Sequence, residues 1–446
     1  MKNRYHFIFT IAAIICALHA QAQVITTIAG NGIDGYTGDG GLAIDAAFTP
    51  AGLTTDSAGN IYFGDIVHSV VRKIDVAGII TTIAGDGVEG FPTDGVQATN
   101  SHLAWPIDVA VDVGGNVYIS ESINNRIRKV SPDGIITTVA GGGVTRDLAH
   151  NAIATQVSLW SPDGIVVDSV GSIYFAERFN HCISKVSKDG IITTIAGTGT
   201  GGYNGDNVIA TDAHLNYPQG IAIDRSGNIY FSDAGNNRIR KINTASIITT
   251  IAGIGTWGYN GDNIAATDAQ LKAASDIAID KGGNIYIADP GNQSIRIIDN
   301  GGIITTNAGT GVAGFFGDGG QAVDAQLNNP ARITVNSFDN LYIADIGNER
   351  IRRVKYSLSV KDAVETISAI DVSPNPSNGR FTLSVTSIAA QQVKITITNV
   401  LGERVYERVC ATGKDKEINL STAPGLYLLS VYTAGGRCSK RVSIVN

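Results

Sequence analysis

The stretch from residue 107 to residue 141 reads IDVAVDVGGNVYISESINNRIRKVSPDGIITTVAG. It contains four short runs rich in Ile, Val, Tyr and Thr, namely IDVAVD (107–112), NVYISE (116–121), RIRKV (126–130) and IITTVAG (135–141). β-Branched and aromatic residues favour strands, and the Gly, Asn and Asp residues between the runs favour tight turns. The stretch therefore predicts a four-stranded antiparallel meander with short hairpins between its strands.

This meander recurs along the chain at an almost constant spacing. The fourth run appears six times, with its Thr-Thr pair starting at Thr26, Thr81, Thr137, Thr193, Thr249 and Thr305. Successive copies are 55, 56, 56, 56 and 56 residues apart. A second phrase, GNIYFSD in one copy, keeps a step of 56 and places its Asn or Ser at Asn60, Asn116, Ser172, Asn228, Asn284 and Asn340. Such a period is typical of a repeat architecture built from one supersecondary unit.

The connections between copies indicate which repeat architecture forms. Within a copy the turns are short, whereas the fourth strand reaches the next copy through about 20 residues, so all long connections should lie on one face. Four-stranded blades repeated around an axis make a β-propeller. The sequence thus predicts an all-β fold whose six blades of four strands occupy residues 23–356.

The two ends of the repeat region predict how the ring closes. The run at residues 24–30 precedes any complete blade, and the last blade stops after the run RIRRV (350–354) without a fourth strand. We expect the N-terminal run to complete the sixth blade as its outer strand, because this pairing removes a free sheet edge.

The repeats also resemble a known family. The phrase YPQGIAIDRSGNIYFSDAGNNRIRKI (217–242) is similar to NHL repeats, and the connection GTGTGGYNGDNVIATDAHLNYP (197–218) is similar to that of bacterial members. The resemblance covers roughly residues 24–354. It implies a propeller, but such propellers include protein-binding and RNA-binding modules, sensor domains and a few lyases, so the fold does not decide the function.

After Tyr356 the period is lost, and a second domain is predicted. A linker at 357–370 leads into VSPNPSNGRFTLSV (372–385), KITITNVLGERVYE (394–407) and a strand-rich end at 416–445. These alternating runs predict a small antiparallel β-sandwich at 371–446. The motifs SPNPSNG, NVLGERV and APGLYLLSV resemble the type A sorting domain of the type IX secretion system of Bacteroidetes. The resemblance implies that the type IX machinery is a partner, with later removal of the domain or attachment at the cell surface.

The N-terminus predicts a secretory signal peptide at residues 1–22. Lys2 and Arg4 precede an apolar run from residue 7 to residue 18, and a small-x-small site predicts cleavage after Ala22. A lipoprotein is disfavoured because Ile15 before Cys16 is too large. No other run reaches the length that spans a bilayer, so we expect a secreted or outer-surface protein without a transmembrane segment, exported through the periplasm.

Few cysteines remain after cleavage, so disulfides do not form the framework. Cys410 and Cys438 could pair within the C-terminal domain, and Cys182 is expected to be a buried apolar residue. The net charge of −7 is concentrated in the propeller, since the C-terminal domain has an excess of basic residues. An acidic surface disfavours nucleic acid and suits cations or basic partners.

Two sets of acidic residues repeat with the blades. The first follows the second strand and comprises Asp65, Glu121, Glu177, Asp233, Asp289 and Asp345. We expect these residues to cap the following turn and to pair with a nearby Arg such as Arg126, Arg238 or Arg350, although a ring of carboxylates could also hold cations.

The second set lies in the long connections, where an aromatic residue precedes an Asp by three positions. The pairs are Tyr36/Asp39, Phe91/Asp94, Tyr203/Asp206, Tyr259/Asp262 and Phe315/Asp318. Structural turns are the favoured interpretation, with calcium binding as the alternative cofactor, because Asp in a Gly-rich loop can ligate this ion. The third blade departs from the pattern, with Asp147 and His150 at those positions.

A third position varies between glycine and charge. At the entry of the inner strand successive blades carry Gly52, Asp108, Gly164, Gly220, Asp276 and Arg332. Because inner strands line the central channel, we expect Asp108, Asp276 and Arg332 to meet at its mouth. They form either a ligand site or a solvated ion pair.

These patterns favour a binding protein over an enzyme. The five His residues of the propeller are scattered without zinc-type spacing, and no glycine-rich segment opens a helix. We expect the propeller to bind a protein or a glycan through the face with the long connections, using the five aromatic residues named above. The alternatives are a metal-dependent lyase or lactonase-like hydrolase acting in the channel, and a structural or adhesion component.

Overall fold

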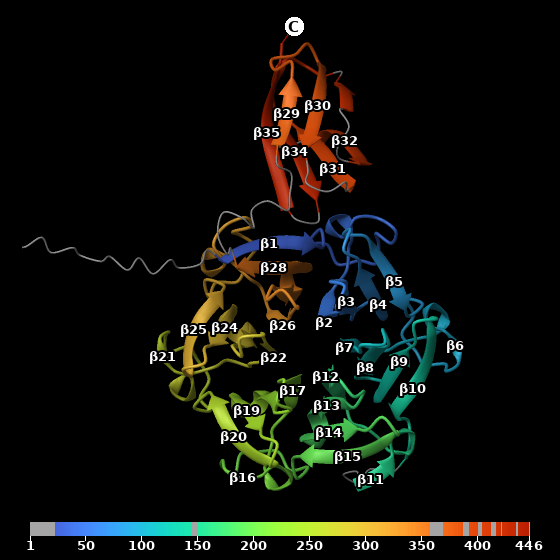
Figure 1. Ribbon diagram of the computed structural model, residues 1–446, viewed down its shortest axis with the longest axis vertical. Coiled ribbons are helices and arrows are strands. Elements are labelled where there is room, and N and C mark those ends of the chain that lie inside the picture. The colour runs from blue at the N-terminus through green and yellow to red at the C-terminus, as the bar shows by residue number, and fades with distance from the viewer. Residues whose placement is uncertain are drawn as a thin grey trace, which may run out of the picture.

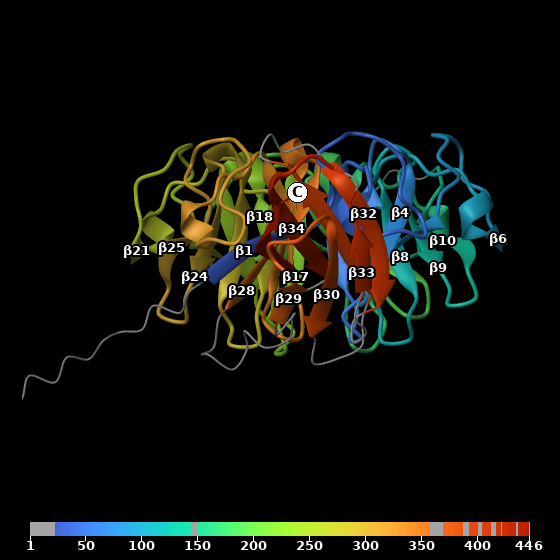
Figure 2. The same ribbon diagram turned by 90° about the horizontal axis from the view of Figure 1, so that it is seen from above.

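The computed structural model describes residues 23–144, 150–356, 369–386, 392–399, 404–411, 416–420, 422–433 and 436–445. The predicted signal peptide lies outside these residues, as does most of the predicted linker. Figure 1 views the ring of blades along its axis, and Figure 2 shows the same ring edge-on.

Six antiparallel sheets surround a central axis, and we number the blades 1–6 by their inner strands. The inner strands are β2 (Pro50–Thr55), β7 (Pro106–Val111), β12 (Pro162–Val167), β17 (Pro218–Ile223), β22 (Asp276–Ile279) and β26 (Pro330–Val335). The second strands are β3 (Ile61–Asp65), β8 (Val117–Glu121), β13 (Ile173–Glu177), β18 (Ile229–Asp233), β23 (Ile285–Asp289) and β27 (Leu341–Asp345). The third strands are β4 (Val70–Ile74), β9 (Arg126–Val130), β14 (Cys182–Val186), β19 (Arg238–Ile242), β24 (Ser294–Ile298) and β28 (Arg350–Tyr356). The outer strands are β5 (Ile80–Ala84), β10 (Ile135–Gly141), β15 (Ile191–Ala196), β20 (Ile247–Ala252), β25 (Ile303–Ala308) and β1 (Gln23–Ala29).

The predicted closure of the ring is confirmed. β1 is the outer strand of blade 6 and pairs antiparallel with β28, so that Ile25 lies opposite Val354. Ile25 and Ala29 are fully buried, as is Val354. The first and last strands of the propeller therefore share one sheet, and the chain ends do not leave an open blade.

The prediction of four strands per blade is incomplete for blades 2–5. In these blades the long connection adds a fifth short strand on the outer edge, namely β6 (Val96–Gln97), β11 (His150–Ile153), β16 (Val208–Ile209) and β21 (Ile264–Ala265). Strands of two to four residues are too short to show a periodic pattern, so tertiary pairing creates them. Each one satisfies backbone groups on an edge that would otherwise be free.

Short 3-10 helices complete the connections. Those in the long connections are η1 (Ala43–Asp45), η2 (Ala98–Asn100), η3 (Ala154–Gln156), η5 (Ala210–Asp212), η7 (Ala266–Asp268) and η9 (Ala322–Asp324). Those after the second strands are η4 (Arg178–Asn180), η6 (Ala234–Asn236), η8 (Pro290–Asn292) and η10 (Ile346–Asn348). Since second strands end where long connections begin and end, both groups lie on one face, which we call the long-connection face.

The core of the propeller lies between neighbouring blades. One cluster joins Phe231, Ile221 and Ile229 of blade 4 to Tyr174 and Ala176 of blade 3, and all five side chains are buried. Clusters of the same composition recur around the ring. This is the packing expected when a sheet that is apolar on both faces stacks against the next sheet.

The C-terminal domain is a β-sandwich, as predicted. One sheet contains β29 (Ala369–Ser373), β30 (Arg380–Thr386) and β33 (Lys416–Asn419). The other contains β31 (Gln392–Thr398), β32 (Arg404–Ala411), β34 (Gly425–Thr433) and β35 (Gly436–Ile444). Phe381 and Leu383 of the first sheet pack with Ile395, Leu429 and Val431 of the second in one buried cluster.

The suggested pairing of Cys410 with Cys438 is wrong. Cys410 belongs to β32 and Cys438 to β35, and these are the two edge strands of the sheet with β31 and β34 between them. Three strand spacings of about 4.8 Å exceed the span of about 7 Å that a disulfide tolerates between Cα atoms. Cys182 is free and buried, as expected.

Candidate binding face

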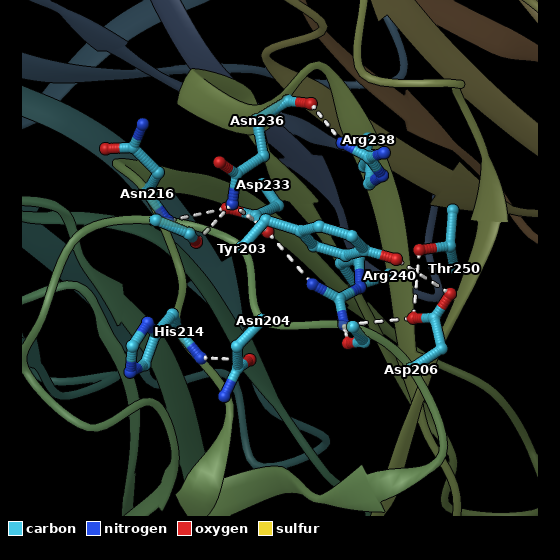
Figure 3. A network of polar contacts seen from close by, with 12 residues as sticks. Tyr203, Asn204, Asp206, His214, Asn216, Asp233, Asn236, Arg238, Arg240 and Thr250 are labelled. Carbon is cyan, nitrogen blue, oxygen red and sulfur yellow. Dashed lines mark hydrogen bonds and ion pairs between the residues drawn. The ribbon is translucent and has the colours of Figure 1, made fainter.

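Five blades hold a fully buried arginine in the third strand. The residues are Arg72, Arg128, Arg240, Arg296 and Arg352. Figure 3 shows the arrangement in blade 4, where Nη1 of Arg240 lies 3.2 Å from Oδ2 of Asp233 and Nη2 lies 3.1 Å from Oδ1 of Asp206. Asp233 ends β18 and Asp206 belongs to the long connection. The guanidinium therefore ties the long connection to the body of the blade.

The acidic residue after each second strand is buried and does not ring an exposed face. In blade 4 Asp233 accepts hydrogen bonds from the backbone N–H of Asn216 at 2.7 Å and from the side chain of Asn236 at 2.8 Å. Burial raises the pKa of Asp233 to about 6, although Asn236, Asn216 and Arg240 act in the opposite direction. The carboxylate thus joins the turn, the long connection and the third strand, a role that a solvated cap would not need.

The arginine that pairs with the acid lies two residues further along the third strand than expected from the sequence. Arg238, the residue directly opposite Asp233 in the strand register, donates to the backbone carbonyl of Asn236 at 3.1 Å. Arg240 points to the same side of the strand two residues further in, and it forms the ion pair. Arg126 and Arg350 likewise donate to backbone carbonyls of the turn, while Arg128 and Arg352 pair with the acids.

In most long connections the aromatic residue and the Asp both contact the same buried arginine. The hydroxyl of Tyr203 donates to Asp206 at 3.1 Å, and the guanidiniums of Arg238 and Arg240 lie 3.9 and 5.0 Å from the centre of its ring. Tyr36, Tyr259 and Phe315 hold equivalent places on an arginine. Phe91 instead is 85% exposed.

Each Asp of this set has an arginine as its partner. The ion pairs are Asp39–Arg72, Asp94–Arg128, Asp206–Arg240, Asp262–Arg296 and Asp318–Arg352. Within the described residues no group of three or more His, Cys, Asp or Glu side chains is arranged to hold a metal ion. The geometry supports the structural interpretation of these loops.

The predicted residues at the channel mouth come together, and a fourth joins them. Arg332 of blade 6 crosses the axis to form an ion pair with Asp163 of blade 3, and Asp108 and Asp276 interact with it electrostatically. All four residues are buried, with exposed fractions of 3–8%. The expected solvated pair is therefore a buried cluster. Asp163 was missed because it lies one position before the repeat position that varies.

Two of the three glycines at this position are required by the neighbouring aspartates, and the third, Gly164, faces the backbone of Gln219 and Gly220. A Cβ atom on Gly52 would lie 1.9 Å from Oδ1 of Asp108, and one on Gly220 would lie 2.2 Å from Oδ1 of Asp276. The other carboxylate oxygen accepts a backbone hydrogen bond from the next blade, from Ile165 for Asp108 at 2.9 Å. Each Asp thus connects three blades, which explains the alternation of glycine and charge.

The cluster carries more negative than positive charge in a buried place. Burial raises the pKa of Asp108 to about 8 against the influence of Arg332, and the nearby Asp276 adds to the rise. Burial raises the pKa of Asp276 to about 6. The three carboxylates raise the pKa of Arg332, although burial alone would lower it. Asp108 therefore holds a proton at neutral pH, which reduces the repulsion within the cluster.

Beside the cluster the channel holds an open pocket of about 160 Å³. Asp108 and Asp276 line one end, and the walls are mostly aliphatic, from residues such as Ile165, Ile221 and Ile333. Together with Asp163 and Arg332, these two carboxylates bring four charged side chains together where the inner strands begin.

An exposed aromatic cluster lies at the border of blades 3 and 4 and was missed from the sequence. Trp160, Phe179 and Tyr217 are 45%, 43% and 41% exposed. The ring centres of Trp160 and Phe179 are 6.3 Å apart, and those of Phe179 and Tyr217 are 5.8 Å apart. Trp160 and Tyr217 precede inner strands and Phe179 lies in η4, so the cluster belongs to the long-connection face. Comparison of the blades could have found it, since no other blade has an aromatic residue at the position of Phe179 and only blade 1, with the buried Phe48, has one at the position of Trp160.

Comparisons with known proteins agree with both domains. The family described as "Secretion system C-terminal sorting domain" matches residues 371–445. The family described as "Teneurin NHL domain" matches residues 199–258. The chain is an NHL-type propeller with a secretion sorting domain.

The sequence similarity to curated relatives extends across the NHL propeller. Human teneurin-4 is 28% identical over 400 residues, which cover 79% of this chain and 14% of teneurin-4. Teneurin-1 of Gallus gallus is 30% identical over 403 residues, with coverages of 79% and 14%. The NHL propeller chain thus spans only about a seventh of the length of these relatives.

Solved structures share the fold of the NHL propeller. One is described as an auxiliary nutrient binding protein from Bacteroides thetaiotaomicron, with a TM-score of 0.55, 18% identity and coverage of 75% of this chain and 76% of that chain. At this identity the likeness shows the fold alone. The sorting domain indicates secretion or an outer-surface location, and the described residues include no helix long and apolar enough to cross a membrane.

Proposed function

We propose that this secreted or surface-located propeller is a binding protein whose protein or glycan ligand docks on the long-connection face. One observation carries the proposal. The buried arginines hold five long connections in place, while the exposed residues between them differ from blade to blade. A rigid frame with variable exposed residues is the arrangement by which repeat scaffolds bind ligands.

The channel pocket of about 160 Å³ is smaller than the clefts of about 300–1,000 Å³ that hold small-molecule ligands, which favours a surface site over a site inside the ring. The proposed binding face has two parts. Its buried base at the channel mouth is formed by Asp108, Asp276 and Arg332, and its exposed loops carry the aromatic residues Tyr36, Phe91, Tyr203, Tyr259 and Phe315. A similar fold described as an auxiliary nutrient binding protein is compatible with this function.

The test is a screen of the purified exported chain on glycan and protein arrays. We expect a ligand whose binding is weakened by Phe91→Ala on the long-connection face. The matched control is Phe338→Ala, because Phe338 is 72% exposed and lies in a short turn on the opposite face. A ligand that is lost with Phe338→Ala and kept by every variant of the long-connection face would contradict the proposal.

We propose further that the sorting domain directs export by the type IX machinery. Removal of residues 371–446 should leave a folded propeller in the periplasm, because the sandwich has its own core and shares no strand with the blades. Cell fractionation with an antibody to the propeller measures this. Secretion of the truncated chain at the level of the Phe338→Ala chain would refute the assignment.

A further inference from the structure

We propose that the aromatic cluster of Trp160, Phe179 and Tyr217, which we call the aromatic platform, binds the sugar rings of a neutral glycan. The inference rests on the proposed function, since it assigns a place and a ligand class to the binding face. It is independent of the five aromatic residues of the long connections, four of which pack on an arginine of the frame.

The platform is a stepped surface of three rings from two blades. The planes of Trp160 and Phe179 meet at 57°, and those of Phe179 and Tyr217 at 89°. His181 packs against Tyr217 with ring centres 4.9 Å apart, and its Nδ1 accepts the backbone N–H of Tyr217 at 3.2 Å. Burial lowers the pKa of His181, so the imidazole is neutral at pH 7 and its Nε2 carries the proton. A neutral polar group therefore adjoins the ring of Tyr217.

The frame of the propeller does not need these rings. At the position of Trp160 the later blades carry Asn216, Lys272 and Asn328. At the position of Phe179 they carry Gly235, Gly291 and Gly347. Blade 1 carries Phe48 at the position of Trp160, but Phe48 is fully buried in the core, whereas Trp160 is 45% exposed. Blades 4 to 6 fold in the same way without rings at these two positions, so the fold does not require the exposed rings of blade 3.

Tyr217 also occupies an unfavourable backbone conformation. Its φ is +50°, in the left-handed region that bulky residues rarely adopt and that Asn tolerates better. Blade 6 carries Asn329 at this position with a φ of +53°. The same position has a positive φ in the other blades from 2 to 5, with Trp105 at +52°, Ser161 at +51° and Ala273 at +57°. The conformation therefore belongs to the repeat, and an exposed bulky residue at this position is not a choice that backbone stability favours.

The size of the platform disfavours a protein partner. With aromatic side chains of about 150–250 Å² each, three rings that are 41–45% exposed offer roughly 200–350 Å². A stable protein interface buries about 800 Å² on each partner. An oligosaccharide needs far less area, because one sugar ring covers one aromatic ring.

Charge and shape select among the smaller ligands. Single-stranded nucleic acid also stacks on aromatic rings, but its phosphates would meet a protein of net charge −7. A neutral sugar meets no such repulsion. Its C–H groups form an apolar face that fits the negative face of an aromatic ring, while its hydroxyls reach groups such as Arg178, whose guanidinium lies 5.6 Å from the centre of the Phe179 ring.

The repeat itself supplies the variants for the test. Trp160→Asn, Phe179→Gly and Tyr217→Asn each introduce the residue of another blade, so the fold should be retained, and thermal unfolding of each variant checks this. Binding to laminarin, soluble starch and mannan is measured by affinity gel electrophoresis with the full exported chain. Phe338→Ala is the control for an exposed aromatic residue elsewhere.

We expect at least one of these glucans or mannans to bind, each single variant to weaken binding about tenfold, and the triple variant to abolish it. Phe338→Ala should leave the affinity unchanged. Glycan binding that survives in the triple variant overturns the platform and leaves the proposed function intact, as does a chain that binds only proteins. A chain that binds neither glycan nor protein overturns both.

Discussion

Blades 3 and 4 have the same strands but different contacts on the long-connection face. Blade 4 has the buried Arg240, held between Asp233 and Asp206 and covered by Tyr203. In blade 3 the corresponding residue is Ser184, which donates to Glu177 at 2.6 Å. Its long connection has Asp147 and His150, whose side chains lie outside the described residues, where blade 4 has Tyr203 and Asp206.

The difference shows that arginine, acid and aromatic ring form one unit. The arginine and the Asp of the long connection pair in five blades, the aromatic ring packs on the arginine in four of these, and blade 3 has none of the three residues. A buried guanidinium needs two carboxylates, and the exposed Asp has no reason to remain once the guanidinium is gone. The same blade carries Trp160 and Phe179 on its surface, so the departure from the repeat coincides with the proposed site.

The largest effect is expected from breaking the unit in blade 4. Arg240→Ser removes the cation that pairs with the buried Asp233. It also removes the ion pair that holds the long connection against the blade. Loss of one partner of a buried ion pair should lower the free energy of unfolding by about 3–5 kcal/mol, measured by urea denaturation. Arg238→Ser is the matched control, because Arg238 is partly exposed and packs on the same Tyr203 ring, but its hydrogen bonds go to the backbone carbonyls of Asn236 and Ile254, whereas Arg240 pairs with two carboxylates.

The comparison of blades also predicts a rescue. Addition of Tyr203→Asp and Asp206→His to Arg240→Ser gives blade 4 the residues of blade 3. If the three residues form one unit, the triple variant should be more stable than the sum of the separate changes, since coupled neighbours are not additive. Equal losses for Arg240→Ser and Arg238→Ser would show that the unit does not exist.

A smaller effect is expected at the inner strands, where blade 3 has Asp163 and blade 4 has Gln219. Asp163 pairs with Arg332, and the pKa of the neighbouring Asp108 is raised to about 8 from an ordinary value of 3.8. The folded state therefore holds a proton that the unfolded state releases near pH 4. This stabilisation is complete below pH 4 and is lost as the pH rises through 8.

Between pH 6 and pH 9 the native chain should thus lose more than about 1 kcal/mol of unfolding free energy, and Asp108→Asn should lose less. Asp112→Asn is the control, because hydrogen bonds from Asn116 and Tyr118 lower the pKa of Asp112 despite its partial burial, and blade 6 naturally has Asn336 there. Parallel pH profiles for the native chain and Asp108→Asn would contradict the assignment of the proton.

The smallest effect concerns backbone strain in blade 4. Tyr217→Asn should raise the free energy of unfolding by about 0.5–1 kcal/mol, since Asn adopts a positive φ more readily than Tyr. The reverse change in blade 6, Asn329→Tyr, should lower it by a similar amount. Differential scanning calorimetry of the two variants measures both shifts, and a destabilised Tyr217→Asn would show that the ring contributes more to packing than its conformation costs.

Much of the fold was predictable because the repeat carries it. The period of 56 residues, the short turns and the displaced first strand predicted six blades and their closure, which the pairing of β1 with β28 confirms. The site was less accessible. Arg238 and Arg240 of blade 4 lie two residues apart on the same side of one strand. The sequence did not show which of them pairs with Asp233.

The sequence by itself determined the architecture, since strand alternation and turn residues are local properties repeated six times. Only the tertiary structure decided the partners of the charged residues. Arg332 and Asp163 are 169 residues apart and meet because blades 3 and 6 lie opposite each other across the axis. Trp160, Phe179 and Tyr217 meet because two blades stack at one border. Contacts across a closed ring depend on distances in space, and a repeat pattern along the chain does not contain them.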